Sequence, residues 1–207
     1  MADYRLYYLP QSGNCYKVAL MLALTDSDWE PHYIDMFGGA TRAPEFLALN
    51  SMGELPVLEH GQTVLTQSAM ILLYLAEQTG QFGGTTDAER REILRWLFWD
   101  NHKGSTQMAT TRFNHNFIPE DKRSADVSDF LTARTRGGLK VLNRQLKGRD
   151  WVAADRPTIA DLSIAGYLFY PEPFGYDAES FPNVAAWLDR LKALPGWQAP
   201  YDLMKAP

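Results

Sequence analysis

Residues 11–15, which read QSGNC, place a hydroxyl and a thiol three positions apart, between a short apolar run and a helical pattern. A two-cysteine redox enzyme carries Cys-x-x-Cys at such a turn from strand to helix. Here Ser12 stands in place of the first cysteine, and Cys15 keeps the place of the second. The segment is a disabled redox motif, a hydroxyl serving other chemistry, or a helix cap followed by a core cysteine.

A second segment, NSMGELPVL at residues 50–58, brings Leu55 and Pro56 to the start of an expected strand. A cis bond between these two residues would turn the main chain of Leu55 outward, where a peptide ligand can pair with it. A trans bond is the commoner form of X-Pro and would make this an ordinary turn. Both forms stay open from the sequence.

Two further segments carry groups that can bind an anion. Gln67 and Ser68 precede the helical run AMILLYL, where a serine is an ordinary cap and free amides also make a seat for a carboxylate. Arg42 lies in the Gly-rich loop GGATRAPEF, from which it either reaches a carboxylate or stays solvated at the surface. For each segment the structural reading is the commoner one when the segment is taken alone.

The periodicity of apolar residues changes once along the chain. Residues 4–78 alternate short strands and helices, with a hairpin around residues 60–62. After the Gly-rich stretch TGQFGGTTD the period is helical, over residues 87–115, 123–147, 158–170 and 184–193. The sequence predicts an α/β domain over residues 1–79 and an all-helical domain over residues 86–207.

Composition narrows the classes of partner. The 207 residues are 45% hydrophobic, which suffices for a core, and the net charge of -5 without basic blocks argues against nucleic acid and anionic membranes. No apolar run approaches the roughly 20 residues that span a bilayer, and MADYR is no signal peptide. The single cysteine fits a reducing, cytoplasmic location, and the four histidines lack the spacing of a metal site.

In this order, the segments resemble the cytosolic glutathione S-transferase family, with features of its bacterial, phi, theta and nu types. SGNCYK is similar to the Ser-x-Asn-x-x-Arg of phi-type members, NSMGELPVL to Asn-Pro-x-Gly-x-Val-Pro, and QS to a Glu/Gln-Ser pair. RPTIADLSIAG is similar to the family's C-terminal motif, in which Thr158 and Asp161 form a capping box. The resemblance covers nearly the whole chain. It implies an N-terminal thioredoxin-like domain followed by an all-α domain.

The resemblance also implies glutathione as co-substrate, with Ser12 activating its thiol and Asn14 as an alternative or supporting donor. Both residues lie near the start of an expected helix, whose dipole favours thiolate over thiol. The implied binding residues lie in turns or at a helix start: Arg42 for the glycyl carboxylate, Leu55 before Pro56 for the cysteinyl backbone, and Gln67 and Ser68 for the γ-glutamyl end.

Gln67 is neutral where many members of the family have glutamate, which leaves the ammonium of the ligand without a carboxylate partner. Members with Gln-Ser often take an aspartate from the second subunit of a homodimer. Asp100 in WLFWDNHKG is the candidate for this role, and a solvated or helix-paired aspartate is its alternative.

The leading hypothesis for function is a detoxifying transfer of glutathione to a small hydrophobic electrophile, bound in a second-substrate site of the helical domain. One alternative is a glutathione-dependent reductase of disulfides or peroxides, as in nu-type members. Another is a glutathione-binding protein without turnover. The same thiolate serves both catalytic hypotheses, so the sequence leaves the second substrate open.

Overall fold

The computed structural model describes residues 2–206 and separates into two compact units. One unit comprises residues 1–83 together with 194–207, and the other comprises residues 84–193. The first contains a mixed sheet with helices and the second is helical, which confirms the expected fold class. The last 14 residues of the chain, expected in the helical domain, belong instead to the sheet-containing unit.

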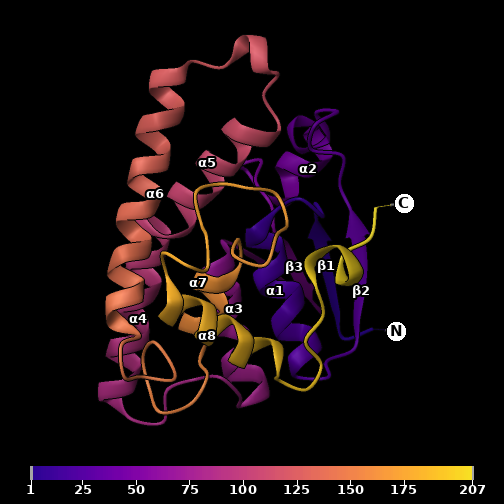
Figure 1. Cartoon of the computed structure of the whole chain (residues 1–207). Coiled ribbons are helices and arrows are strands. Elements are labelled where there is room, and N and C mark those ends of the chain that lie inside the picture. The colour runs from indigo at the N-terminus through magenta and orange to yellow at the C-terminus, as the bar shows by residue number, and fades with distance from the viewer. Residues whose placement is uncertain (1, 207) are drawn as a thin grey trace. The chain divides into compact units, whose positions relative to one another are not determined.

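The first unit is built on a sheet with the strand order β2-β1-β3-β4 (Figure 1). Strands β1 and β2 are parallel, and the other neighbours are antiparallel. The strands are β1 (Tyr4–Tyr8), β2 (Trp29–Tyr33), β3 (Val57–His60) and β4 (Thr63–Thr66). The helices are α1 (Gly13–Leu24), α2 (Pro44–Leu49), α3 (Ser68–Thr79) and α9 (Pro200–Leu203), with a 3-10 turn η1 (Ala40–Arg42).

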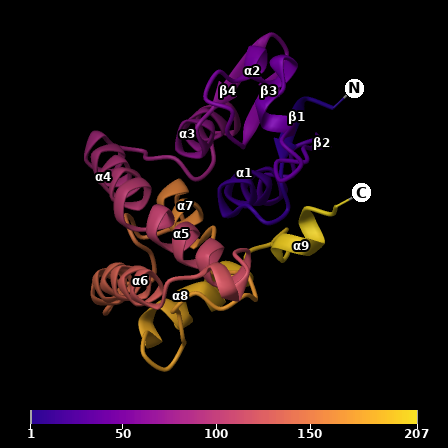
Figure 2. The same cartoon turned by 90° about the horizontal axis from the view of Figure 1, so that it is seen from above.

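The sequence explains which faces of these strands and helices are buried and which strand lies at the edge of the sheet. In β1 the side chains of Tyr4, Leu6 and Tyr8 alternate into the core, as expected of a strand with one face buried. Strand β2 carries Pro31, which lacks a donor for the ladder and therefore belongs at an edge. Helix α1 is buried at every residue from Cys15 to Leu22 because it packs against both β1 and α3 (Figure 2).

The C-terminal segment is held to α1 and β1 by two tyrosine hydroxyls. Tyr8 Oη donates to the carbonyl of Lys205 at 2.6 Å, and Tyr16 Oη donates to that of Gln198 at 2.7 Å. Helix α9 lies beside α1 (Figure 2). The two buried tyrosines thus find partners 182 or more residues away along the chain.

The helical unit contains α4 (Asp87–Lys103), α5 (Ser105–Asn116), α6 (Ala125–Gln145), α7 (Ile159–Ala165) and α8 (Pro182–Lys192), with a 3-10 turn η2 (Glu120–Lys122). The sequence predicted one helix over residues 87–115, but the structure has two that meet at Gly104. A Cβ at Gly104 would lie 2.5 Å from Oδ1 of Asp100, whose carboxylate folds back over the break.

Helix α7 is buried along its whole length, and its start confirms the predicted capping box of Thr158 and Asp161. Both oxygens of the Asp161 carboxylate accept hydrogen bonds, from Val152 and Thr158 amides at 2.9 Å and from Trp187 Nε1 at 3.0 Å. These bonds join the start of α7 to α8, so the motif serves folding. Within residues 2–206, no helix is both long and apolar enough to cross a membrane.

Candidate functional site

The candidate site lies at one end of the sheet, which we call the Tyr8 end. Strand β1 finishes there at Tyr8, β3 begins at Val57 opposite Tyr7, and β4 finishes at Thr66 opposite Val57. The segments that follow β1, precede β3 and follow β4 must therefore start from neighbouring points. These are the three segments that the sequence singled out around Ser12, Leu55 and Gln67.

Ser12 is the N-cap of α1, and its Oγ accepts a hydrogen bond from the backbone amide of Cys15 at 3.3 Å. This interaction uses a lone pair of the hydroxyl, which can still donate its hydrogen. Cys15 itself has no exposed surface, and burial raises the pKa of its thiol to about 11, while a hydrogen bond between the Ser12 side chain and this thiol acts to lower that pKa. The serine is at the helix start, whereas the cysteine is a core residue.

Asn14 and Ser68 connect the starts of α1 and α3. The hydroxyl of Ser68 donates to Oδ1 of Asn14 at 3.4 Å, a long hydrogen bond between half-buried side chains. Ser68 is the first residue of α3 and does not cap it. The structure thus brings together Asn14 and Ser68, two of the residues that the family resemblance implies for the site.

The start of α3 is unusual in its backbone and its capping. Gln67 occupies the N-cap with φ 68° and ψ 111°, a region that residues other than glycine rarely adopt. No side chain makes a capping hydrogen bond there. Strained backbone of this kind is found most often where a ligand or a reaction uses it. The first amides of α3 are therefore a suitable seat for a carboxylate.

Residues 50–54 form the turn that enters β3. The buried side chain of Asn50 fixes it, donating to the carbonyl of Glu54 at 2.8 Å and accepting from the amide of Met52 at 3.1 Å. The Leu55–Pro56 bond is cis. Leu55 is half-buried and Pro56 is buried.

Arg42 lies against the same turn. Gly53 has φ 63°, and a Cβ on it would come 2.6 Å from Nη1 of Arg42 and 2.9 Å from the carbonyl of Thr41. Only a glycine lets the guanidinium lie so close to the turn. Arg42 itself is exposed. Its position therefore supplies a positive charge beside the segment that contains Leu55.

Glu54 is a residue of this region that the sequence hypotheses missed. Its Oε2 accepts a hydrogen bond from Nε2 of Gln67 at 3.0 Å, and the same nitrogen lies 3.2 Å from Sδ of Met52. The turn before β3 and the start of α3 are thereby tied together by a carboxylate. The sequence could have drawn attention to Glu54, because this residue lies between Gly53 and Leu55 in the segment NSMGELPVL.

Asp100 lies inside the helical unit with 1% of its surface exposed. Its Oδ1 accepts from the amide of Ser105 at 2.9 Å and from its hydroxyl at 2.8 Å, and Oδ2 accepts from Ser163 Oγ at 2.6 Å. The carboxylate thus caps α5 and ties α4 to α7. The ligand contact that the resemblance implies for Asp100 stays a prediction, and the carboxylate already accepts three hydrogen bonds within its own unit.

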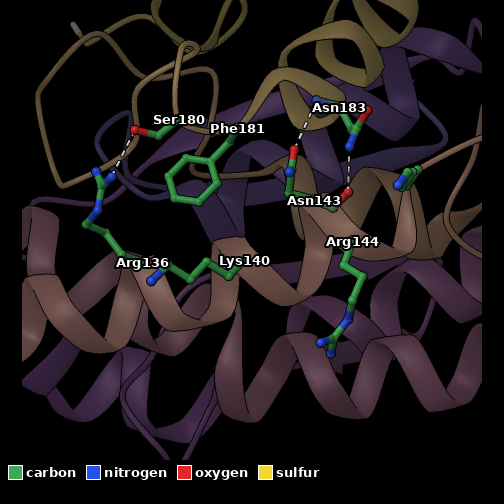
Figure 3. Close-up of a pocket in the computed structure, with 8 residues that line it drawn as sticks. Arg136, Lys140, Asn143, Arg144, Ser180, Phe181 and Asn183 are labelled. Atoms are coloured by element: carbon green, nitrogen blue, oxygen red, sulfur yellow. Dashed lines mark hydrogen bonds between the residues drawn. The ribbon is translucent and has the colours of Figure 1, made fainter.

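The helical unit also has an open hollow of about 500 Å³ between α6 and the start of α8. It is lined by Arg136, Lys140, Asn143, Arg144, Lys147, Ser180, Phe181 and Asn183. Figure 3 shows Asn143 facing Asn183 and Arg136 facing Ser180, and these pairs are hydrogen-bonded. Because Oδ1 of Asn143 already accepts from the first amides of α8, this helix start is closed to an anion.

No group of three or more His, Cys, Asp and Glu side chains within residues 2–206 is arranged to hold a metal ion. The Tyr8 end brings together the hydroxyl of Ser12, the starts of α1 and α3, main-chain groups of the turn before β3 and the charged side chains of Arg42 and Glu54. Such a set can hold an extended ligand that carries charges at both ends.

Family models match both parts of the chain. Residues 6–83 match the glutathione S-transferase N-terminal domain, and residues 108–195 match the glutathione S-transferase C-terminal domain. A glutathione S-transferase from Pseudomonas fluorescens (Pf-5) superposes with a TM-score of 0.90 at 30% identity, over 96% of this chain and 99% of its own.

Two other relatives bear on the chemistry. The disulfide-bond oxidoreductase YfcG of Escherichia coli (strain K12) is 28% identical over 198 residues, which cover 92% of this chain and 90% of YfcG. A glutathione transferase from Burkholderia graminis has a TM-score of 0.86 at 27% identity, over 100% of this chain and 89% of its own. Its structure contains two glutathione molecules bound per protein subunit.

Proposed function

Because the chain belongs to the glutathione S-transferase family, we propose that it binds glutathione at the Tyr8 end of the sheet and transfers it to small hydrophobic electrophiles. In this reaction the thiol proton passes to solvent, the thiolate sulfur forms a bond to carbon, and the leaving group departs with its electron pair. The protein has to hold the tripeptide and favour the thiolate over the thiol.

The observation that carries this proposal is the junction of two helix starts by the hydrogen bond between Asn14 and Ser68. One start presents the hydroxyl of Ser12, and the other presents amides with no side-chain cap. One ligand that spans both helix starts would present its carboxylate to the amides of α3 and its sulfur to the start of α1. This matches the order of groups in a γ-glutamyl-cysteinyl ligand.

The remaining roles follow from the turn before β3. Leu55 would pair with the cysteinyl backbone through its main chain, next to the cis bond to Pro56. Arg42, beside Gly53, would attract the glycyl carboxylate. These roles agree with an extended ligand that runs from the start of α3 toward η1.

Ser12 is the proposed donor to the sulfur. Since a hydrogen bond to a charged group contributes about 1.5 to 3 kcal/mol, its loss should raise the pKa of the bound thiol by roughly one to two units. Ser12→Ala should therefore lower kcat/KM by about ten- to a hundredfold near neutral pH and recover much of the loss at higher pH. Asn14 is the supporting donor.

The test is the absorbance of the thiolate of bound glutathione against pH, in the wild type, Ser12→Ala and Asn14→Ala. Ser27→Ala, which removes a hydroxyl beyond the far end of α1, is the matched control. A midpoint that moves only in Asn14→Ala would transfer the catalytic role to Asn14. A midpoint unchanged in both variants would reduce Ser12 to a helix cap.

A second candidate function is the glutathione-dependent reduction of disulfides. It is favoured by the similarity to YfcG and to a structure with two glutathione molecules per subunit. One glutathione thiolate would attack a disulfide sulfur and release a thiol, and a second would attack the mixed disulfide to give oxidised glutathione. Cys15 takes no part in this, since its thiol is buried.

A panel of substrates separates the candidates. Turnover of an aryl halide supports transfer, and turnover of a small disulfide or a hydroperoxide alone supports reduction. Binding of glutathione without turnover of any substrate would indicate a glutathione-binding protein that is not an enzyme.

We also propose that the protein is a cytoplasmic homodimer, as the resemblance to a cytosolic family implies. Sedimentation as a 23.5 kDa monomer at micromolar concentration would contradict the dimer.

A further inference from the structure

The hollow between α6 and the start of α8 is lined by positive charge without any acid. Arg136, Lys140, Arg144 and Lys147 line it from α6 and from the residues just after that helix, and no Asp or Glu is among the eight lining residues. A hollow of similar volume in the sheet-containing unit, about 490 Å³, has three carboxylates and one arginine in its lining. The excess of positive charge therefore distinguishes the α6–α8 hollow from the other.

The sequence of α6 produces this charge. Between Asp129 and Asp150 the chain has six Lys and Arg residues and no Asp or Glu. Arg136, Lys140 and Arg144 follow one another at intervals of four residues, so like charges are neighbours on one face of the helix and repel each other. A helix surface that serves folding alone gains from acids among its bases, and α4 has such ion pairs. The unbalanced charge of α6 thus calls for a partner from outside.

Two of these cations are free to bind one. Lys140 and Lys147 are exposed, and their side chains have no partner within residues 2–206. Arg136 is already paired with Asp177 at 2.8 Å. Figure 3 shows the side chain of Lys140 running along α6 toward Arg136, whereas the guanidinium of Arg144 is directed away from α8. The free positive charge at the hollow is therefore carried mainly by the two lysines.

Hydrogen bonds between α6 and α8 hold the walls of the hollow. Oδ1 of Asn143 accepts from the backbone amides of Asn183 and Val184 at 2.9 and 3.3 Å, and the carbonyl of Asn143 accepts from Nδ2 of Asn183 at 2.9 Å. The Nδ2 group of Asn143 has no partner in the described part of the chain, so it keeps both hydrogens as donors. The hollow is therefore formed before any ligand binds, and its free polar groups are donors.

Such a lining suits a small anion with several acceptor oxygens. A volume of about 500 Å³ is in the range of small-molecule sites, and the net charge of -5 disfavours a long polyanion that extends past the hollow. Lys140 and Lys147 lie about 10 Å apart along the helix axis, because each residue rises about 1.5 Å. Linked phosphates place a charge and acceptor oxygens at successive points along such a distance.

We infer that the α6–α8 hollow binds a small polyphosphate, a chain of two or three linked phosphates either free or on a nucleoside, through Lys140 and Lys147 with Nδ2 of Asn143 as a further donor. The bound phosphates reduce the repulsion among the cations of α6, so binding stabilises the folded protein. The site uses only residues of the helical unit. It does not depend on the proposed binding of glutathione.

Isothermal titration calorimetry with the full chain tests this site, at constant ionic strength and without divalent cations, because salt screens exposed charges. The probes are tripolyphosphate, adenosine triphosphate, adenosine, citrate and a single-stranded oligonucleotide. The variant Lys140→Gln/Lys147→Gln removes the two free charges. The matched control Lys103→Gln/Lys122→Gln removes two exposed lysines of the same unit that do not line the hollow.

We expect the wild type to bind tripolyphosphate and adenosine triphosphate but not adenosine. Lys140→Gln/Lys147→Gln should bind both polyphosphates at least about tenfold more weakly, and the control should stay within about twofold of the wild type. Citrate should bind less tightly than tripolyphosphate, because its carboxylates span a shorter distance. Without a ligand, Lys140→Gln/Lys147→Gln should unfold at a temperature no lower than the wild type, since like charges have been removed.

The two polyphosphates also distinguish the source of the phosphates. Tighter binding of adenosine triphosphate would identify a nucleotide, and tighter binding of tripolyphosphate would identify free polyphosphate; either result supports the site.

Three results would overturn the inference. An equal loss of affinity in Lys140→Gln/Lys147→Gln and in the control would assign the binding to overall charge. Citrate bound as tightly as tripolyphosphate would remove the assignment to phosphates, and an oligonucleotide bound more tightly than adenosine triphosphate would indicate a nucleic-acid surface in place of a small-molecule site. A wild type that binds no polyphosphate would refute the site and leave the proposed function intact.

Discussion

Helices α3 and α7 begin with the same requirement, backbone amides without a partner in the helix, and meet it in opposite ways. At α7 the side chains of Thr158 and Asp161 cap the start in both directions, and the whole arrangement is buried. At α3 no side chain caps the start, and its N-cap Gln67 is exposed with a positive φ.

The difference separates a helix start built for folding from one suited to a ligand. In the first turn of α7 the amide of Ala160 donates to the hydroxyl of Thr158, and the buried Asp161 carboxylate accepts from the Thr158 amide and from Trp187, so an external anion has no access. The amides of α3 lack a side-chain cap, and a bound carboxylate would stabilise them. A side-chain cap stabilises a helix start in the free protein. An uncapped start can instead be stabilised by a bound ligand.

Replacement of Asp161 should give the largest effect on stability. Asp161→Ala leaves the amides of Val152 and Thr158 and the indole of Trp187 without an acceptor in the core, so we expect the free energy of unfolding to fall by about 3 kcal/mol or more. Chemical denaturation measures it. Asp161→Asn, which keeps an acceptor oxygen, should lose less and serves if the alanine variant does not fold.

The matched change at the other helix start is Ser68→Ala. It should alter the free energy of unfolding by less than about 1 kcal/mol, because the hydroxyl makes only a long bond to Asn14. Its affinity for glutathione should nevertheless fall by about tenfold, since the γ-glutamyl carboxylate loses a donor. Equal losses of stability from Asp161→Ala and Ser68→Ala would abolish the distinction between the two helix starts.

A smaller effect of opposite sign is expected at Gln67. Glycine accepts the φ of 68° without strain, so Gln67→Gly should raise the free energy of unfolding by about 1 kcal/mol while weakening the binding of glutathione. The control is Gln78→Gly within α3, which should lower stability by about 1 kcal/mol. If Gln67→Gly destabilises as Gln78→Gly does, the backbone at the start of α3 is not strained.

The smallest effect concerns Cys15 near the start of α1. Burial raises the pKa of its thiol from 9.0 to about 11, so an aromatic disulfide reagent at pH 8 should react with it only when denaturant is added. Because the folded pKa is the higher one, this thiol's contribution to stability is present below pH 9 and is lost as the pH rises toward 11. Rapid labelling of the native protein would contradict the buried position.

Local sequence patterns were enough to predict the sheet-containing unit and the helices after it. The spacing of apolar residues that distinguishes a strand from a helix involves only residues close together in the sequence. The break at Gly104 was not predictable in this way. A single glycine is tolerated within a helix, and what ends α4 is the carboxylate of Asp100 accepting from the amide of Ser105. That contact exists only once the two helices have formed.

The same limit applies to the site. Short patterns at helix starts drew attention to Ser12 and Ser68, the family resemblance supplied the roles proposed for them and for Asn14, and the structure brings Asn14 into contact with Ser68. Asp100 was suggested because the resemblance implies an aspartate from a second subunit; its burial could not be predicted, because it depends on how α4, α5 and α7 pack together. Glu54 was overlooked because its partner Gln67 lies 13 residues away, across the hairpin of β3 and β4.

The return of residues 194–207 to the sheet-containing unit has a consequence for building hybrid enzymes from relatives. Tyr8 and Tyr16 depend on carbonyls of Lys205 and Gln198, so a cut near residue 83 does not yield a self-sufficient module. A chimera that exchanges the N-terminal half must carry the C-terminal tail of the same parent. With the tail of another parent, the buried hydroxyls of Tyr8 and Tyr16 could be left without carbonyl acceptors at the right positions.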